Sequence, residues 1–423
     1  MTSERVNVSR REFLIHTGLT GASFALGLSL PLGNKAPAAE AAAPESLPEI
    51  NAWVVIEPDD TVIIRIARSE MGQGTLTGLA QLVAEELECD WSKVTTEYPT
   101  PGQSLARDRV WGAFATGGSR GIRTSHDYVR KGGAVAREML IQAAADSWGV
   151  PPGECSAAAS VITHNPSGRT TTYGKVAALA AKLEPPFEVE LKDPKDWKIA
   201  GKPVKRLDTL DKLTGKQVYS ADLRLPGLLN AAIKACPVFG GTVKRFDAAA
   251  ISQRPGVHKV VQVGDNAVAV VADTWWHAKT ALDALPIQWD EGPNAKLDSA
   301  AIDDMLSEGL DADDVFVGNQ AGDVEAALEG AAKTVTATYG YPYQAHACME
   351  PMNATARWTR QRCEVWCPTQ NGESALQDTA AAAGLPAEQC EVYKLHLGGG
   401  FGRRSIHDYI TQVVTIAKQL PGT

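Results

Sequence analysis

The seven cysteines of this 423-residue chain never occur as Cys-x-x-Cys. That spacing is shared by many iron–sulfur sites, by c-type haem attachment and by zinc ribbons, so none of these is supported. Cys363 and Cys367 are the closest pair, and in a strand their spacing places both on one face, as expected of two small buried apolar side chains. The eight histidines also form no ligand pattern. Any electron-transfer cluster is therefore expected on another chain.

Basic runs and strongly apolar runs are scarce as well. The net charge is −9, and outside the first residues and one arginine pair no basic run suggests a polyanion groove, which sets nucleic acid aside as a partner. A membrane-spanning helix needs about 20 strongly apolar residues, whereas the stretch from Leu14 to Leu32 is interrupted by His16, Gly18 and Gly21. With 44% hydrophobic and 22% charged residues, the chain has an ordinary globular composition and length for two or three domains.

Residues 1–45 are predicted to be an export signal and linker. Arg10 and Arg11 precede the weakly apolar stretch, and an alanine-rich segment follows at residues 36–43. This order is that of a secretory signal, and the arginine pair indicates the twin-arginine type. We therefore predict a periplasmic protein, with an uncleaved signal that associates it with the membrane as the alternative. Twin-arginine export usually accompanies a cofactor inserted in the cytoplasm, so a bulky redox group is expected.

Two glycine loops are predicted to precede helices. Gly72, Gln73 and Gly74 follow a predicted hairpin (52–56 and 61–67) and precede a helical apolar pattern that runs to Leu87. The second loop, which runs from Thr116 through Gly117 and Gly118 to Ser119, opens a helical stretch at 123–148, with Ser119 as its expected cap. Main-chain N–H groups at a helix start suit a phosphate, so two such loops suggest one large anionic ligand.

Two other interpretations of these loops remain. A nicotinamide dinucleotide fingerprint needs a third glycine where this chain has Thr77, and a βαβ unit where it has a hairpin. Two ordinary capped helices without a ligand are the structural alternative.

A third glycine loop lies near the C-terminus, where Gly398, Gly399, Gly400 and Gly402 surround Phe401. Glycines permit positive φ angles and close approach of a ligand to the main chain, and successive N–H groups can form an anion-binding concavity. The following pair, Arg403 and Arg404, can either bind phosphate or pair with acidic neighbours. A plain glycine-rich hairpin is the alternative for the run itself.

Beyond the first loops, a Pro- and Lys-rich passage at 184–204 is predicted to be a linker, with a domain boundary near residue 205. A compact α+β module is expected to follow it, and residues 296–330 are predicted to be helical. The segments predicted after the boundary are strands at 231–234, 257–263, 267–272, 287–289, 333–339, 354–358 and 363–366, and helices at 274–285 and 406–420.

In this order the motifs resemble, over essentially the whole chain, the molybdopterin-binding subunit of the xanthine dehydrogenase and aldehyde oxidase family, isoquinoline 1-oxidoreductase beta-subunit type. The segments 211–222, 226–227, 255–257 and 275–278 look like that family's α/β hammerhead domain, and 344–351, 368–370 and 398–402 resemble its cofactor-domain motifs. The resemblance implies a multidomain α+β fold. Its parts are the signal and linker (1–45), a permuted molybdopterin-binding part (46–204), the hammerhead (205–293) and an incomplete molybdopterin-binding part (294–423).

The resemblance further implies a molybdopterin cytosine dinucleotide carrying molybdenum, with the metal held by pterin sulfurs and by no protein ligand. Gln370 would hydrogen-bond an oxo ligand of the metal, and the main chain around Phe401 would line it, which makes these two the implied catalytic residues. The implied cofactor-binding residues are Gly72, Gln73, Gly74, Thr116, Gly117, Gly118, Ser119, Gln370, Gly399, Gly400, Phe401, Gly402 and Arg403.

The implied reaction is oxidation of a small-molecule substrate, an aldehyde or an N-heterocyclic aromatic, with oxygen derived from water. Electrons would pass to iron–sulfur clusters on a small 2Fe–2S partner subunit, and export favours a c-type cytochrome as acceptor over a soluble nicotinamide. The family's general base is a glutamate near the end of a longer chain, and this sequence has no counterpart of it; Glu350 is implied to be structural or to line the site. The alternative expectation is therefore a non-catalytic cofactor-binding or interaction fragment.

Overall fold

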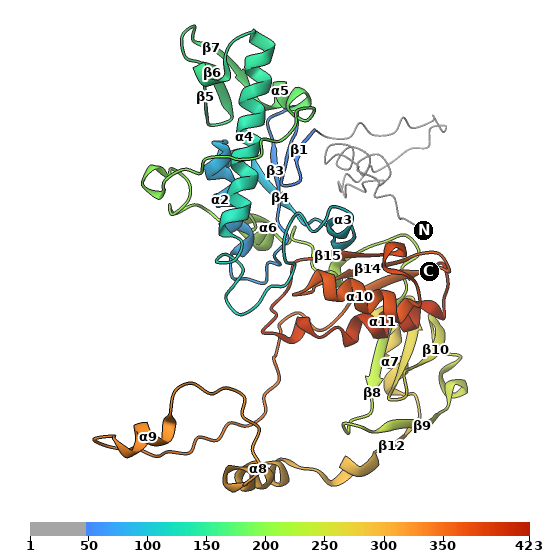
Figure 1. Ribbon diagram of the computed structural model, residues 1–423. Helices are drawn as coiled ribbons and strands as arrows, with labels where there is room; N and C mark the ends of the chain where they lie inside the picture. The colour runs from blue at the N-terminus through green and yellow to red at the C-terminus, as the bar shows by residue number, and fades with distance from the viewer. Residues whose placement is uncertain (1–47) are drawn as a thin grey trace, which may run out of the picture. The chain divides into compact units, whose positions relative to one another are not determined.

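The computed structural model describes residues 48–423, so the predicted export signal lies outside the described residues. The chain divides into two compact units (Figure 1), which are described separately. The first unit consists of residues up to Pro226 together with Cys348–Thr423, and the second of Gly227–Ala347. Both units combine helices with small, mostly antiparallel sheets, which confirms the predicted multidomain α+β class. No helix in the described part of the chain combines the length and apolar composition that a membrane crossing requires.

The first unit begins with a four-stranded sheet in the order β1-β2-β3-β4. The predicted hairpin is confirmed as β2 (Val54–Ile56) and β3 (Val62–Arg65), which pair antiparallel, with β1 (Glu49–Asn51) beside β2. β4 (Val94–Glu97) runs parallel to β3, so the chain crosses over between them through the predicted helix, α2 (Thr75–Leu87). The loop between β3 and α2 is thereby placed at the carboxyl end of a sheet strand.

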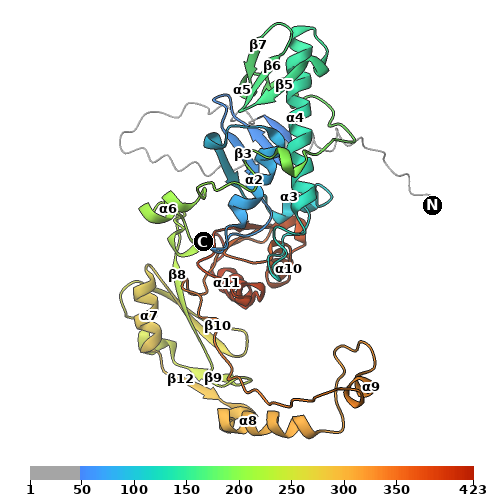
Figure 2. The same cartoon turned by 90° about the vertical axis from the view of Figure 1, so that its left-hand side faces the viewer.

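Helix α4 (His126–Trp148) lies alongside α2 in both views (Figure 2). The two helices approach closely because Gly133 has no side chain: a Cβ there would lie 2.4 Å from the carbonyl oxygen of Val83. The predicted cap at Ser119 is wrong. Ser119 adopts a φ of +53°, the residues after it form turns, and α4 begins only at His126.

Several smaller elements complete this half of the unit. They are α3 (Pro101–Leu105), the sheet β5-β6-β7 (Cys155–Ala158, Val161–His164 and Arg169–Thr172), α5 (Tyr173–Ala180) and α6 (Thr209–Thr214). None of these was predicted from the sequence.

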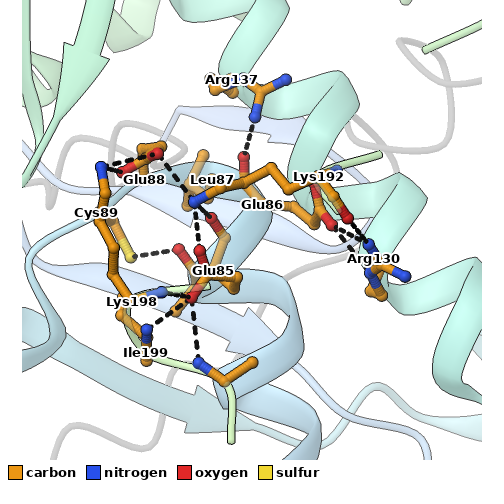
Figure 3. Close-up of polar contacts among 12 residues, drawn as sticks. Glu85, Glu86, Leu87, Glu88, Cys89, Arg130, Arg137, Lys192, Lys198 and Ile199 are labelled. Carbon is orange, nitrogen blue, oxygen red and sulfur yellow. Dashed lines mark hydrogen bonds and ion pairs between the residues drawn. The ribbon is translucent and has the colours of Figure 1, made fainter. Parts of the chain in front are cut away.

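The passage predicted to be a linker is bound to helix α2 (Figure 3). One carboxylate oxygen of Glu85 accepts the main-chain N–H groups of Lys198, Ile199 and Ala200 at 2.8, 2.5 and 3.0 Å. Lys192 forms ion pairs with Glu85 and with Glu88. Residues 192–200 are therefore fixed to α2 by charged hydrogen bonds, although they contain only one short 3₁₀ turn.

The C-terminal part of the first unit is a sheet of β13 (Thr355–Trp358), β14 (Cys363–Cys367) and β15 (Cys390–Lys394), covered by α10 (Gly372–Ala383) and α11 (Asp408–Lys418). β13 is antiparallel to β14 and β15 is parallel to it, so α10 is the crossover. The predictions of β13, β14 and α11 are confirmed, as is the burial of both cysteines of β14. β15 and α10 were not predicted.

The second unit contains the antiparallel sheet β10-β11-β8 (Val257–Val263, Ala267–Ala272 and Asn230–Ala235) with α7 (Trp275–Asp283) packed on β8 and β11. A separate pair joins β9 (Thr242–Phe246) to β12 (Ile287–Asp290). All but β9 match predicted segments. The helices α8 (Ser299–Glu308) and α9 (Val324–Glu329) follow, also in a segment predicted to be helical.

The strand predicted at 333–339 is wrong. Within the described chain these residues pair with no strand, and all of them are exposed. Their alternating sequence has strand propensity, but a strand also needs a neighbour to accept its main-chain hydrogen bonds.

Candidate functional site

Residues 67–70, which follow β3, connect the three predicted glycine loops, and we call them the hub. The main-chain N–H of Ser69 donates to the Thr116 hydroxyl at 2.9 Å, and the Ser69 hydroxyl donates to the carbonyl of Thr369 at 2.7 Å. The carbonyl of Glu70 accepts the N–H of Leu397 at 3.1 Å. Segments that are up to 327 residues apart in the sequence therefore meet at four consecutive residues.

The first loop is organised by a carboxylate of the hub. Glu70 is 1% exposed, and its two oxygens accept the N–H groups of Gly72, Gly74 and Leu76 at 2.8, 3.0 and 3.0 Å. Arg206 pairs with the same carboxylate at 3.1 Å. The negative charge at the start of α2 is therefore the carboxylate of Glu70, and the positive end of the helix dipole stabilises it.

The side chain of Gln73 also closes this loop. Its Oε1 accepts the N–H of Met71 at 2.7 Å, and its Nε2 donates to the carbonyl of Ser69 at 2.9 Å. The donors at 72, 74 and 76 are therefore engaged within the chain, and cofactor binding by Gly72, Gln73 and Gly74 stays a prediction.

The second loop presents free donors. Gly117, Gly118 and Ser119 are exposed, and among the described residues no acceptor pairs with their main-chain N–H groups. Gly118 and Ser119 have φ angles of +58° and +53°, and the Arg120 side chain lies beside Gly118. Successive N–H groups in a turn of this kind form a concavity that suits an anion. Of the two loops predicted to bind phosphate, this one has the unpaired N–H groups.

Gln370 joins the second loop to the third. It is 3% exposed; its Nε2 donates to the carbonyl of Thr116 at 2.9 Å, and its Oε1 accepts the N–H of Gly402 at 3.0 Å. The main chain adds two bonds, from Thr116 N–H to the Gln370 carbonyl at 2.7 Å and from Gln370 N–H to the Arg404 carbonyl at 3.1 Å. One N–H of the Gln370 amide is left over after these contacts.

The third loop approaches the other two without side chains. A Cβ on Gly400 would lie 2.7 Å from Oε1 of Gln370 and 2.8 Å from the sulfur of Met71, so only glycine fits between them. Gly399, Phe401 and Gly402 have φ angles of +94°, +52° and +92°. Phe401 is 70% exposed, which means that its strained backbone is not compensated by packing of its ring.

Both arginines after the loop pair with acids. Arg403 binds Asp408 through two nitrogen–oxygen contacts of 2.8 Å, and its cofactor role stays a prediction. Arg404 is fully buried, pairs with Glu350 at 3.0 Å and donates to the carbonyls of Gly399 and Glu350 at 2.7 and 2.6 Å. Glu350 also accepts the N–H of Gly398 at 2.9 Å, so it acts as a structural carboxylate that anchors the loop.

Three titratable residues beside the hub were not predicted: Lys394, which is buried, and Tyr98 and His396, which are half-buried. Burial, with a smaller effect of the Arg68 charge, lowers the pKa of Lys394 to about 7. Burial raises the pKa of Tyr98, whose hydroxyl accepts the Glu70 N–H at 2.9 Å. Burial also lowers the pKa of His396, whose ring centroid lies 5.6 Å from that of Tyr98. The only signal in the sequence is the alternation of β15, which turns Lys394 toward the interior.

Comparison with known proteins agrees with this arrangement. Two models described as a molybdopterin cofactor-binding domain match residues 15–209 and 310–420, ranges that contain all three loops and Gln370. The isoquinoline 1-oxidoreductase subunit beta of Brevundimonas diminuta is 30% identical over 95% of this chain and 56% of its own length. The membrane-bound aldehyde dehydrogenase (pyrroloquinoline-quinone) of Gluconacetobacter polyoxogenes is 27% identical over 99% of this chain and 55% of its own.

Among solved structures, quinoline 2-oxidoreductase from Pseudomonas putida 86 aligns with a TM-score of 0.41 and 21% identity, covering 52% of this chain and 33% of that one. The chain spans about half the length of the curated relatives it matches. Matches to two molybdopterin-binding models, together with relatives that align over nearly the whole chain, lead to one assignment. The chain belongs to the molybdopterin-binding subunits of the xanthine dehydrogenase and aldehyde oxidase family.

Proposed function

We propose that this chain is the molybdopterin-binding part of an exported molybdenum hydroxylase that oxidises an aldehyde or an N-heterocyclic aromatic with oxygen derived from water. The names of the relatives support the substrate classes, since one is an isoquinoline oxidoreductase subunit and another an aldehyde dehydrogenase. Electrons would leave through an iron–sulfur subunit, with a cytochrome as the later acceptor. The cofactor would be molybdopterin cytosine dinucleotide.

The residues present fit such a cofactor. The unpaired N–H groups of Gly117, Gly118 and Ser119, with Arg120 beside them, offer donors to a phosphate. Because Gly400 has no side chain, its main chain lies directly next to Gln370, whose amide keeps one free N–H. The second loop would therefore hold the dinucleotide phosphates, and Gln370 with residues 400–402 would face the metal end. When bound, the cofactor supplies the two-electron oxidation chemistry.

The chain's own contribution is to hold these groups in place. Gln370 fixes the second and third loops to each other through both ends of its amide, so that the donors of one and the bare main chain of the other keep a constant spacing. The exposed ring of Phe401 offers an apolar face for a planar substrate. The Gln370 bridge is the observation that carries the proposal, because it joins two predicted cofactor loops through a buried polar side chain.

The test is whether the purified protein contains molybdenum and cytidine nucleotide. Full-length chain from a molybdenum-replete host is analysed for molybdenum by mass spectrometry and for cytidine nucleotide after acid hydrolysis. We expect both in stoichiometric amounts. Gly400→Ala should lower both, because the added methyl displaces the Gln370 amide, whereas Gly153→Ala, in an open exposed turn, should not. A wild-type preparation free of metal and nucleotide would contradict the proposal and favour a non-catalytic fragment.

We also propose export by the twin-arginine route, on the strength of Arg10, Arg11 and the apolar stretch that follows. A reporter fused to residues 1–45 should reach the periplasm, and the double change Arg10→Lys, Arg11→Lys should hold it in the cytoplasm. Unchanged export of the lysine variant would refute the twin-arginine assignment.

A further inference from the structure

Two basic side chains, Arg68 of the hub and Lys394 beside it, are buried without a carboxylate partner. Arg68 is 5% exposed and Lys394 is 6% exposed. Arg68 donates to the hydroxyls of Ser125 and Thr124 at 3.0 and 2.9 Å and to the carbonyl of Ala115. The ammonium of Lys394 donates to the carbonyl of Ala67. Within the described residues, neither side chain lies within ion-pair distance of a carboxylate.

Other buried or half-buried cations of the same unit, such as Arg130, Arg404 and Lys192, are paired. Arg130 binds Glu86 at 2.7 Å, and Lys192 binds Glu85 (Figure 3). Arg404 binds Glu350 at 3.0 Å. A buried charge is costly unless an opposite charge accompanies it. Arg68 and the basic side chain of Lys394 beside it therefore form a site that a negative group would complement.

The surroundings of Lys394 favour a cation but supply no anion. Its ammonium lies 4.5 Å from the ring centroid of Tyr98 and 4.8 Å from that of Phe114. Such aromatic faces attract an ammonium without neutralising it. The side chain therefore sits in a site shaped for a positive charge whose counter-charge lies elsewhere.

Both basic side chains contact the segment that leads into the second loop. Arg68 binds the carbonyl of Ala115, the residue before Thr116, and Lys394 binds the residue before Arg68. Phe114, which packs on Lys394, belongs to the same segment. An anion held by the N–H groups at 117–119 would thus be bound within five residues of Ala115, which Arg68 contacts, and of Phe114, which Lys394 contacts.

We propose that Arg68 and Lys394 form a buried cation pair whose counter-charge is the phosphate-bearing group bound at residues 117–119, and that this binding is coupled to the uptake of one proton by Lys394. The proton comes from solvent and converts the neutral amine to the ammonium. The inference rests on the proposed function, which supplies the phosphate.

Among Lys394, Cys367 and Tyr98, only Lys394 is expected to change its protonation state near neutral pH. Burial and then the Arg68 charge lower its pKa to about 7. Cys367 lies opposite it on β14, and burial raises the pKa of that thiol to about 12. Burial likewise raises the pKa of Tyr98. Between pH 7 and 8.5 the thiol and the phenol stay neutral, so of these three groups only Lys394 gains or loses a proton.

The first measurement needs no ligand. In the unfolded chain the lysine stays protonated up to a pH of about 10.4, whereas in the folded protein Lys394 loses its proton above a pH of about 7. The unfolded state then binds more protons, so stability due to this group rises with pH. Between pH 7 and 8.5, the urea midpoint of full-length apoprotein should rise relative to that of Lys394→Met. Lys418→Met is the matched control, because Lys418 donates to the Ala382 carbonyl but is exposed.

The second measurement counts protons. Cytidine 5′-diphosphate, whose terminal phosphate has already lost its last proton at these pH values, is titrated into wild-type apoprotein by calorimetry between pH 7.5 and 8.5, in buffers of different ionisation enthalpy. We expect uptake approaching one proton per bound ligand, and affinity that falls by up to about tenfold per pH unit. Binding without proton uptake overturns this inference and leaves the proposed function standing. Failure of cytidine 5′-diphosphate to bind overturns both the inference and the proposed function. The calorimetric measurement uses the wild-type protein, so it tests the inference even if Lys394→Met does not fold.

Discussion

The buried pair of Arg404 and Glu350 gives the sharpest prediction about the third loop. Glu350→Gln removes the charge opposite a guanidinium that is 0% exposed, while keeping the shape of the side chain. Breaking a buried ion pair from one side costs about 3–5 kcal/mol, because the remaining charge stays buried without its partner. The Gly398 N–H loses its charged acceptor at the same time. We therefore expect the free energy of unfolding to fall by about 3–5 kcal/mol.

The neighbouring arginine provides the control. Arg403 and Asp408 form an ion pair of good geometry, but their side chains are 25% and 46% exposed. Exposed pairs are worth about 0–1 kcal/mol, so Asp408→Asn should change stability by no more than that. Urea unfolding followed by circular dichroism at 25 °C measures both variants. The double variant Glu350→Gln, Arg404→Met completes a mutant cycle and should recover part of the loss, because no uncompensated charge remains. Equal effects of Glu350→Gln and Asp408→Asn would refute the reasoning.

Three further predictions concern other parts of the first unit. Gly133→Ala should destabilise the protein by about 1–3 kcal/mol in urea unfolding, because the methyl meets the Val83 carbonyl at the contact of α2 with α4, whereas Gly153→Ala should be neutral. Although burial raises the pKa of Glu85, its bonds to Lys192 and to three main-chain N–H groups outweigh this and lower it. The stabilisation that the Glu85 carboxylate provides is therefore present above its unfolded pKa of about 4.3, and it is lost as the pH falls through its lower pKa in the folded protein. The difference in urea midpoint between wild type and Glu85→Gln should accordingly narrow below about pH 4. Phe401→Gly should change the free energy of unfolding by no more than about 1 kcal/mol, since the ring is exposed and the backbone has positive φ. It should raise the KM for an aromatic substrate if the ring contacts that substrate. An unchanged KM would contradict that contact.

The elements that the sequence predicted correctly are those with local periodicity. The hairpin of β2 and β3 alternates, and α2 repeats its apolar residues every three or four positions, so each pattern is complete within a short window. The strand expected at 333–339 has the same kind of pattern but no partner in the described chain, and pairing is not encoded locally. The start of α4 was misplaced because Ser119 adopts a left-handed conformation that a serine rarely takes.

The site shows a similar division. Its glycine loops and Gln370 could be predicted from the sequence because they match motifs of a known family, and those motifs are associated with cofactor binding. The hub could not, because the bond from Ser69 to Thr369 joins positions 300 residues apart. Arg68 and Lys394 were missed for another reason: in a sequence, a buried cation looks the same as a solvated one.

The carboxylate of Glu70 gives the two N-terminal loops different capacities to bind an anion. At the first loop the N–H groups of Gly72 and Gly74 are already bound to Glu70, so an incoming phosphate would find these donors occupied, while the second loop offers unpaired donors close to Arg68. Two loops that look alike as glycine motifs would then sort the parts of one long ligand by charge. The uncharged ring system would lie along the first loop and the phosphates along the second, so the ligand's direction in the site would follow from a single acidic side chain.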